Sequence, residues 1–316
     1  HLGFLQTLLW PRLHECFSRI EEKARNQGRG LFGEIRTGQD SMGIRLSPFL
    51  SLLTVAMLAT LSGQAVVINP SVDFERPVFT EGGGRSLLVY EITATHCSTC
   101  AEIDPELIQV ADSHGSRIAL IALHPTDSVD AFQPEAAHYR IQRLNSTQDG
   151  VGSSTPTFVV EDGTARRGYD AWSEVQRDIL NQEMRRQNVS EVDIKVTKTD
   201  TGYRASIAHT DLVQATGAQL TMMVVQHGKP MPEDAVNPGG DHRDRVLVGL
   251  AECALDNNTI TARFGLSNAS VAETCESSLS VDFEEMDSWS VILVHEATQE
   301  SLDCLLYTSD AADDDH

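Results

Sequence analysis

The secondary-structure pattern of this chain changes character once, near residue 188. Upstream of that point, nearly continuous apolar runs typical of buried strands alternate with segments of helical periodicity. Downstream, short strand-like runs follow one another between turn signals, with no convincing helix. The sequence therefore predicts an α/β domain over residues 66–188 and an all-β domain over residues 189–303.

The predicted order of elements upstream is strand, helix, strand, helix, two strands and a final helix. The strands are expected at 85–94, 117–125 and in a hairpin over 154–169 that turns at Asp162-Gly163. The helices are expected directly after Cys100, from Val129 to about Leu144, and from about Ala171 to Gln187. This is the order of elements in thioredoxin.

The downstream segment contains seven short strand-like runs separated by turns rich in Gly, Asn and Asp. Such a pattern favours a sandwich of the immunoglobulin or fibronectin type III kind. Cys253 and Cys275 are predicted to form a structural disulfide there, which would stabilise the fold by roughly 3 kcal/mol. The runs are "EVDIKVTK", "YRASIAHT", "AQLTMMVVQ", "DRVLVGLAE", "NTITARFGL", "SLSVDF" and "WSVILVHEA".

Residues 42–65 have the pattern of an export signal. They combine the first methionine, Met42, with a basic residue, an uncharged and mostly apolar run, and small residues that end at Ala65. We expect cleavage before Val66 and a periplasmic or extracellular protein. An uncleaved membrane anchor or a buried helix is the alternative. Residues 1–41 are then expected to be non-native read-through of upstream DNA.

The opposite end of the chain, residues 304–316, resembles the conceptual translation of a sequencing adapter and is expected to be artificial. Without both end segments, the chain keeps four cysteines, an even number that suits an exported protein. The whole chain carries a net charge of −22. We therefore expect neither nucleic acid nor an anionic membrane surface as a partner, and no membrane insertion of the mature chain.

Cys97-Ser-Thr-Cys100 follows a buried strand and precedes a helix. A Cys-x-x-Cys motif suits a zinc site, a structural disulfide or thiol exchange. Structural zinc sites usually draw four ligands from two close pairs, and the sequence has no second pair of this kind. At a helix N-terminus, Cys97 would gain thiolate character, and Cys100 would lie one turn away. These features favour a redox centre and predict no metal.

Residues 80–187 resemble a thioredoxin-fold domain in four features, in addition to the order of their elements. The motif follows a buried strand, and Glu91 lies six residues before Cys97, where thioredoxins have a buried carboxylate. Pro105 matches the proline that kinks the active-site helix, and Thr155-Pro156 matches the cis-proline that faces the cysteines. The pairing with a sandwich resembles secreted proteins related to outer membrane protein 28.

The resemblance implies an exported thiol-disulfide oxidoreductase without a bound cofactor, acting on protein thiols or disulfides together with an unknown redox partner. Cys97, Cys100 and Glu91 are its expected catalytic residues. His96, Thr155 and Pro156 are expected to contact the substrate. His96 replaces the family's tryptophan, and Ser-Thr replaces its usual dipeptide, so the direction of electron flow stays open.

A second interpretation stays open beside the catalytic one. In it, the protein is a non-catalytic secreted binding module whose Cys-x-x-Cys disulfide is only structural. His124, at the end of a predicted strand, is interpreted as a hydrogen-bonding group rather than a catalyst.

Overall fold

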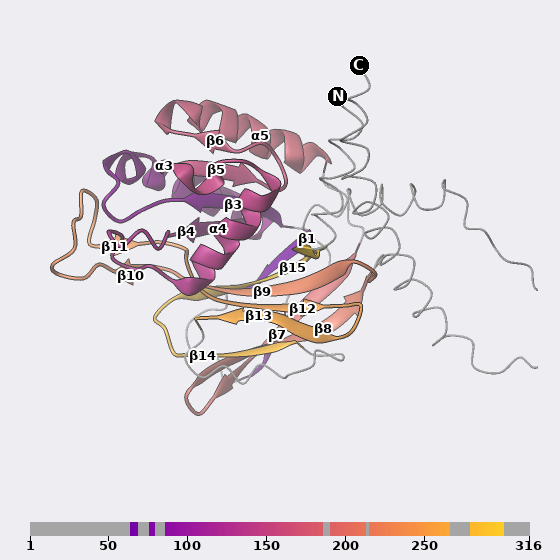
Figure 1. The fold of residues 1–316 in the computed structure, drawn as a ribbon. Coiled ribbons are helices and arrows are strands. Elements are labelled where there is room, and N and C mark those ends of the chain that lie inside the picture. Colours follow the sequence, from indigo (N-terminus) through magenta and orange to yellow (C-terminus); the bar gives the residue numbers. More distant parts are fainter. Residues whose placement is uncertain are drawn as a thin grey trace, which may run out of the picture.

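The computed structural model describes residues 64–68, 76–79, 86–185, 190–212, 215–265 and 279–299. The fold is mixed α/β, with a nine-stranded sheet, a four-stranded sheet and a two-stranded hairpin (Figure 1). Among the described residues, no helix has the length and apolar character needed to cross a membrane. The expected read-through, the adapter-like segment and residues 42–63 of the expected signal lie outside the described residues.

The elements follow the chain in this order: β1 (Gln64–Ile68), β2 (Val78–Phe79), β3 (Leu87–Ile92), α3 (Ser98–His114), η1 (Gly115–Arg117), β4 (Ile118–Leu123), α4 (Glu135–Thr147), η2 (Val151–Ser153), β5 (Thr157–Val160), β6 (Arg166–Arg167), η3 (Tyr169–Ala171), α5 (Trp172–Arg185), β7 (Glu191–Thr199), β8 (Gly202–Asp211), β9 (Ala218–Gln226), β10 (Lys229–Pro230), β11 (His242–Arg243), β12 (Val246–Ala254), β13 (Thr259–Phe264), β14 (Ser280–Glu284) and β15 (Trp289–Ala297).

Strand β3 organises the upstream half of the fold. It pairs parallel with β4 and antiparallel with β5, which pairs with β6. Because side chains alternate along a strand, Leu87 and Val89 pack with α3 and α5, whereas Leu88 and Tyr90 pack with α4 on the other face. Figure 1 shows α5 and α4 on opposite sides of these strands. Glu91 therefore belongs to the face that α3 covers.

The second helix begins later than the sequence predicted. It was expected from Val129, but α4 starts at Glu135, after Pro134. Asp127 accepts hydrogen bonds from the backbone N–H groups of residues 129 and 130, and Asp130 accepts them from residues 132 and 133. Such local side-chain bonds compete with helical ones and keep this segment a loop.

The downstream half contains all seven predicted strands, arranged in two layers. The sheet β14-β8-β7-β2 shares one apolar cluster with β9, β12 and β15 of the large sheet. Tyr203, Phe283 and Trp289 meet inside this cluster, with ring centroids 4.7–5.7 Å apart. Residues upstream of β3 also contribute, because β1 pairs with β15 and β2 with β7.

The expected boundaries of the segments stay predictions, but the strands cross them. Strand β1 includes Gln64 and Ala65 on one side of the expected cleavage point and Val66 on the other. The two halves also share a sheet, since Val246 of β12 pairs with Ala122 of β4. The backbone N–H of Ala122 donates to the carbonyl of Arg245 at 2.8 Å.

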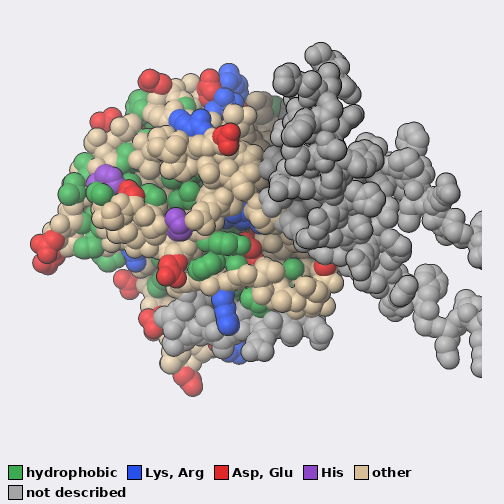
Figure 2. Space-filling view, in the orientation of Figure 1, with side chains coloured by type: hydrophobic (Ala, Val, Ile, Leu, Met, Phe, Trp, Pro, Cys, Tyr) green, Lys and Arg blue, Asp and Glu red, His purple; other side chains and the backbone are tan. Residues whose placement is uncertain are grey.

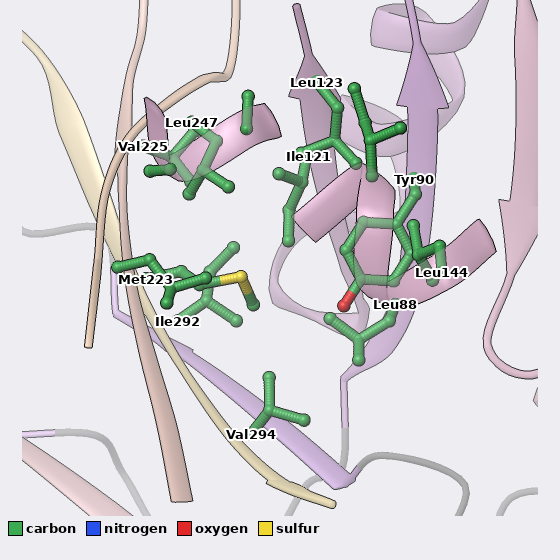
Figure 3. Close-up of a cluster of buried hydrophobic side chains, with 14 of the residues drawn as sticks. Leu88, Tyr90, Ile121, Leu123, Leu144, Met223, Val225, Leu247, Ile292 and Val294 are labelled. Atoms are coloured by element: carbon green, nitrogen blue, oxygen red, sulfur yellow. The ribbon is translucent and has the colours of Figure 1, made fainter. Parts of the chain in front are cut away.

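A second core lies where α4 covers the junction between the halves. Figure 3 shows Leu88 and Tyr90 of β3 facing Met223 of β9 and Ile292 of β15 across this region, and all four side chains are at most 2% exposed. Apolar burial of this kind contributes about 25 cal/mol for each Å² removed from water. The core therefore holds the two halves together through side chains as well as through the shared sheet.

A buried ion pair links α4 to strand β15. Both terminal nitrogens of Arg140 donate to the Glu296 carboxylate at 2.8 Å, and one of them also donates to the hydroxyl of Tyr90 at 2.6 Å. Thr221 donates to Glu296 at 2.6 Å. Arg140 is 2% exposed and Glu296 is 7% exposed. Burial raises the pKa of Glu296, but the charges of Arg140 and Arg143 outweigh it and hold that pKa below its usual value of 4.5.

Replacement of Glu296 by Gln should lower the free energy of unfolding by about 3–5 kcal/mol at pH 7, because the charge of Arg140 would stay buried without its counter-ion. Since the pKa of Glu296 is depressed in the folded protein, its contribution is complete above pH 4.5 and declines as the pH falls below that value. Guanidinium denaturation at several pH values measures the difference.

The matched control is Asp282→Asn, which removes the partner of the half-exposed Arg204 on the four-stranded sheet. Exposed ion pairs contribute about 0–1 kcal/mol. Equal losses of stability in the two variants would contradict the special role of the buried pair.

Candidate functional site

The Cys-x-x-Cys motif lies at the N-terminus of α3. Cys97 is the N-cap residue and Cys100 lies in the first turn. The two form a disulfide, with their Cα atoms 5.2 Å apart. Cys97 is partly exposed, whereas Cys100 is 1% exposed. Because the N-terminus of a helix carries partial positive charge, a thiolate at Cys97 would be stabilised after reduction.

Strand register brings Thr155 and Pro156 to the same edge of the sheet. Residue Thr157 begins β5 and pairs with Ile92, the last residue of β3, so the chain just before β5 lies beside the segment that leads to Cys97. The Thr155-Pro156 peptide bond is cis. Pro156 is buried and Thr155 is half-buried. The structure thus places the expected docking residues and the motif at one end of β3.

A pair of carboxyl groups lies beneath the first turns of α3. Glu91 is 4% exposed on the face of β3 that α3 covers, and Asp104 follows Cys100 by four residues on the inner face of the helix. Burial raises the pKa of Glu91 well above its usual value, and the neighbouring charge of Asp104 raises it further. Burial also raises the pKa of Asp104. The two groups share a hydrogen bond when one of them holds a proton.

His124 and Asp130 form a second buried pair beside these carboxyl groups. His124 follows β4 directly, and its Nδ1 lies 2.8 Å from Oδ2 of Asp130. Burial raises the pKa of Asp130, but bonds from His124 and from the backbone of Thr95 and Phe132 outweigh this and lower the pKa to about 2. Nε2 of His124 is buried and has no hydrogen-bond partner within the described part of the chain.

Thr95, two residues before Cys97, forms hydrogen bonds with two other loops. Its N–H donates to Asp130 at 2.7 Å, its hydroxyl accepts from the N–H of Ala131 at 2.9 Å, and its carbonyl accepts from Arg243 at 3.2 Å. His96 is partly exposed, and its Nε2 lies 3.9 Å from Asp127. The loop that carries the motif is thus held from two sides.

The metal and structural-disulfide alternatives concern the other His, Cys, Asp and Glu side chains of the chain. Among the described residues, no group of three or more His, Cys, Asp or Glu side chains is placed to hold a metal ion. Cys253 is 1% exposed and disulfide-bonded. Cys275 lies outside the described residues, so the predicted bridge between the two cysteines stays a prediction.

Three charged residues of this site were not identified from the sequence, and His124 was interpreted as a hydrogen-bonding group rather than a catalyst. Asp104 had a usable signal, because its spacing of four from Cys100 puts both on one helix face. No sequence signal identified Asp130 or Arg243, since their contacts depend on loops that meet only in the folded protein. His124 does form a hydrogen bond through Nδ1, whereas its Nε2 has no partner among the residues that the structure describes.

The described fold is similar to two solved structures at low sequence identity. No family model matches the chain, and no curated protein matches it. The structure of HBP35 of Porphyromonas gingivalis is similar with a TM-score of 0.42 and 14% identity, over 69% of this chain and 66% of that one. A structural-genomics protein of Agrobacterium tumefaciens is similar with a TM-score of 0.35 and 10% identity, over 63% of this chain and 79% of that one. Scores this low carry no argument about function.

Replacement of Glu91 by Gln should stabilise the oxidised protein at alkaline pH, by about 1–3 kcal/mol, because a neutral amide replaces a charge that lacks full hydrogen bonding. Since the pKa of Glu91 is raised in the folded state, wild-type stability should fall as the pH rises above 4.5, and this fall should be smaller in the variant. Denaturation midpoints measured between pH 5 and 9 test the expectation.

A suitable control is Glu174→Gln, which removes an exposed carboxylate of α5 that pairs with Arg166. This change should leave the pH dependence above 5 unaltered. The interpretation fails if Glu91→Gln follows the wild-type pH curve.

Proposed function

We propose that this protein is an exported thiol-disulfide oxidoreductase that exchanges disulfides through Cys97 and Cys100. In this proposal, a thioredoxin-like domain carries the motif and an immunoglobulin- or fibronectin-like sandwich follows it. The order of elements from β3 to α5, the motif at a helix N-terminus and the cis Thr155-Pro156 bond support the assignment. The expected export signal supports a periplasmic or extracellular location.

One observation carries the proposal: Cys97 is partly exposed whereas Cys100 is 1% exposed, and Cys100 lies one helical turn before Asp104 on the side of α3 that covers Glu91. A disulfide that only staples a loop needs no proton acceptor beneath it. Titratable groups shifted by burial and by a specific neighbour gather at functional sites. Glu91 and Asp104 are such groups, and they lie next to the turn that contains Cys100.

The chemistry follows from these positions. In the reduced protein, the Cys97 thiolate attacks a substrate disulfide, forming a bond to one substrate sulfur and releasing the other as a thiolate that takes up a proton. Cys100 transfers its proton to the carboxyl pair and attacks the Cys97 sulfur. The Cys97–Cys100 disulfide forms, and the second substrate sulfur leaves. The substrate gains two electrons, and an external dithiol restores the protein. The reverse sequence oxidises a dithiol.

Substrate recognition in this proposal uses the exposed side of the motif. An extended protein segment would lie beside Thr155 and Pro156, at the edge where β5 begins, with His96 next to the attacking sulfur. This arrangement requires no bound cofactor. The substrates are protein thiols and disulfides, and the redox partner is unidentified.

Replacement of Cys97 by Ser should abolish reduction of insulin, because no sulfur remains to make the first attack. Replacement of Cys100 by Ser should leave that attack intact and accumulate mixed disulfides, which non-reducing gels reveal. Glu91→Gln should retain the first attack and slow the resolving step by about 100-fold, the lower end of the range of general-base contributions.

Ser113→Ala, at the exposed end of α3, serves as the control and should behave like wild type. If only Cys97→Ser traps mixed disulfides, the two cysteines have the opposite roles. If wild-type protein neither turns over insulin nor reacts with a thiol reagent after mild reduction, the non-catalytic binding module replaces the oxidoreductase.

A further inference from the structure

A loop from the downstream half lies against the motif. Residues 227–245 connect β9 to β12 and include the short strands β10 and β11, which Figure 1 shows on the same side of the molecule as α3. A Cβ atom added to Gly239 would lie 3.2 Å from Cβ of Ala101, the residue after Cys100. The close contact shows that this loop packs directly on the first turn of α3.

Arg243 is the buried centre of this contact. It is 6% exposed. Its guanidinium donates to the carbonyl of Thr95 at 3.2 Å, to the side-chain oxygen of Asn237 at 2.7 Å and to the carbonyls of Gly240 and His242 at 2.8 and 3.0 Å. All four acceptors are uncharged. They satisfy hydrogen bonds but do not neutralise the positive charge, which therefore acts on nearby carboxylates.

The charged groups around the carboxyl pair come from four places in the fold. Strand β3 supplies Glu91, helix α3 supplies Asp104, the loop after β4 supplies His124 with its partner Asp130, and the β9–β12 loop supplies Arg243. Burial raises the pKa of Asp104, and the hydrogen bond with Glu91 and then the charges of Arg243 and His124 act in the opposite direction. An arginine side chain does not lose its proton in a protein, so Arg243 supplies a permanent positive charge.

We propose that Arg243 is a positioning residue of the Cys97–Cys100 site, and that its charge keeps the Glu91–Asp104 pair able to accept the proton of Cys100. The downstream half would then be part of the redox site rather than a separate attachment. This inference rests on the proposed function, because it assigns a role in the resolving step.

The same loop contributes to the outer face of the site. Lys229 places its ammonium 5.2 Å from the ring of Phe132, which links the loop to the segment between β4 and α4. Val236 and Val129, one on each segment, are 67% and 57% exposed. Figure 2 shows apolar side chains interspersed with acidic ones on the face drawn, and a few basic side chains between them. The loop from the downstream half thus contacts both the first turn of α3 and the segment between β4 and α4.

The test compares Arg243→Gln and Arg243→Met with Arg243→Lys, which keeps the charge. Arg243→Met retains a long apolar side chain, so it preserves packing if the glutamine variant folds poorly. The first measurement is the carboxyl titration of Glu91 and Asp104 by carbon NMR in the oxidised protein, which needs no enzymatic activity. The second is the pH profile of the resolving step in mixed-disulfide exchange.

In Arg243→Gln and Arg243→Met, the carboxyl pair should titrate at higher pH than in wild type. The resolving step should slow by about tenfold at pH 7, which is a part of what a general base contributes. Arg243→Lys should restore most of both. The control Arg204→Gln removes a half-exposed arginine that pairs with Asp282 on the four-stranded sheet, and it should change neither measurement.

Three outcomes overturn the inference. The charge of Arg243 has no role if the carboxyl titration is the same in all variants. Its charge is equally irrelevant if Arg243→Lys behaves like Arg243→Gln. If the titration shifts as expected but wild-type protein performs no exchange, the electrostatic coupling is real while the proposed function and the positioning role both fail.

Discussion

The pairing of Val246 with Ala122 joins the two halves of the described chain in one sheet. It makes β12 continue the sheet of β4 and β3, so the chain that enters β12 must approach from the edge where β3 and β4 end. The residue after Ile92 on β3 begins the approach to Cys97 at that same edge. A single backbone contact therefore brings a loop from the downstream half to the first turn of α3.

Two sets of buried charges in this protein differ in how completely they are compensated. The Arg140–Glu296 pair joins opposite charges through two hydrogen bonds, and Tyr90 and Thr221 bond to it as well. Such a network is stable as long as all of its members are present. Beneath the motif, Glu91 faces another acid, and one oxygen of each carboxyl group is buried without a bond within the described residues.

Two facing acids with unbonded buried oxygens destabilise the fold locally. Such destabilising groups are typical of functional sites, and favourable interactions elsewhere in the protein offset them. Burial and the neighbouring acid raise the pKa of Glu91, and burial raises the pKa of Asp104, so both carboxyl groups are costly to ionise where they lie. The rigid first network holds α4 and the downstream strands, and through them the loop that places Arg243 near the carboxyl pair. The stabilising Arg140–Glu296 network thus offsets the unfavourable burial of the Glu91–Asp104 pair.

Local sequence patterns were enough to predict most elements of the fold. The buried strands β3 and β4, the helix after Cys100 and the seven downstream strands follow from short-range periodicity and turn residues, which act over a few neighbouring positions. The start of α4 was wrong because Asp127 and Asp130 compete for backbone N–H groups, an effect that composition does not show. The position of Cys97 at a helix N-terminus also followed from local spacing.

The partners of the motif depended on tertiary structure. Arg243 lies 148 residues from Thr95 in the chain, and their contact exists only because β12 joins β4. Burial of Glu91 could be anticipated from its apolar neighbours, but the raised pKa also requires Asp104 to face it across the interface between helix and sheet. Side-chain type and spacing are local properties, whereas burial and the field of distant charges arise only after the chain has folded.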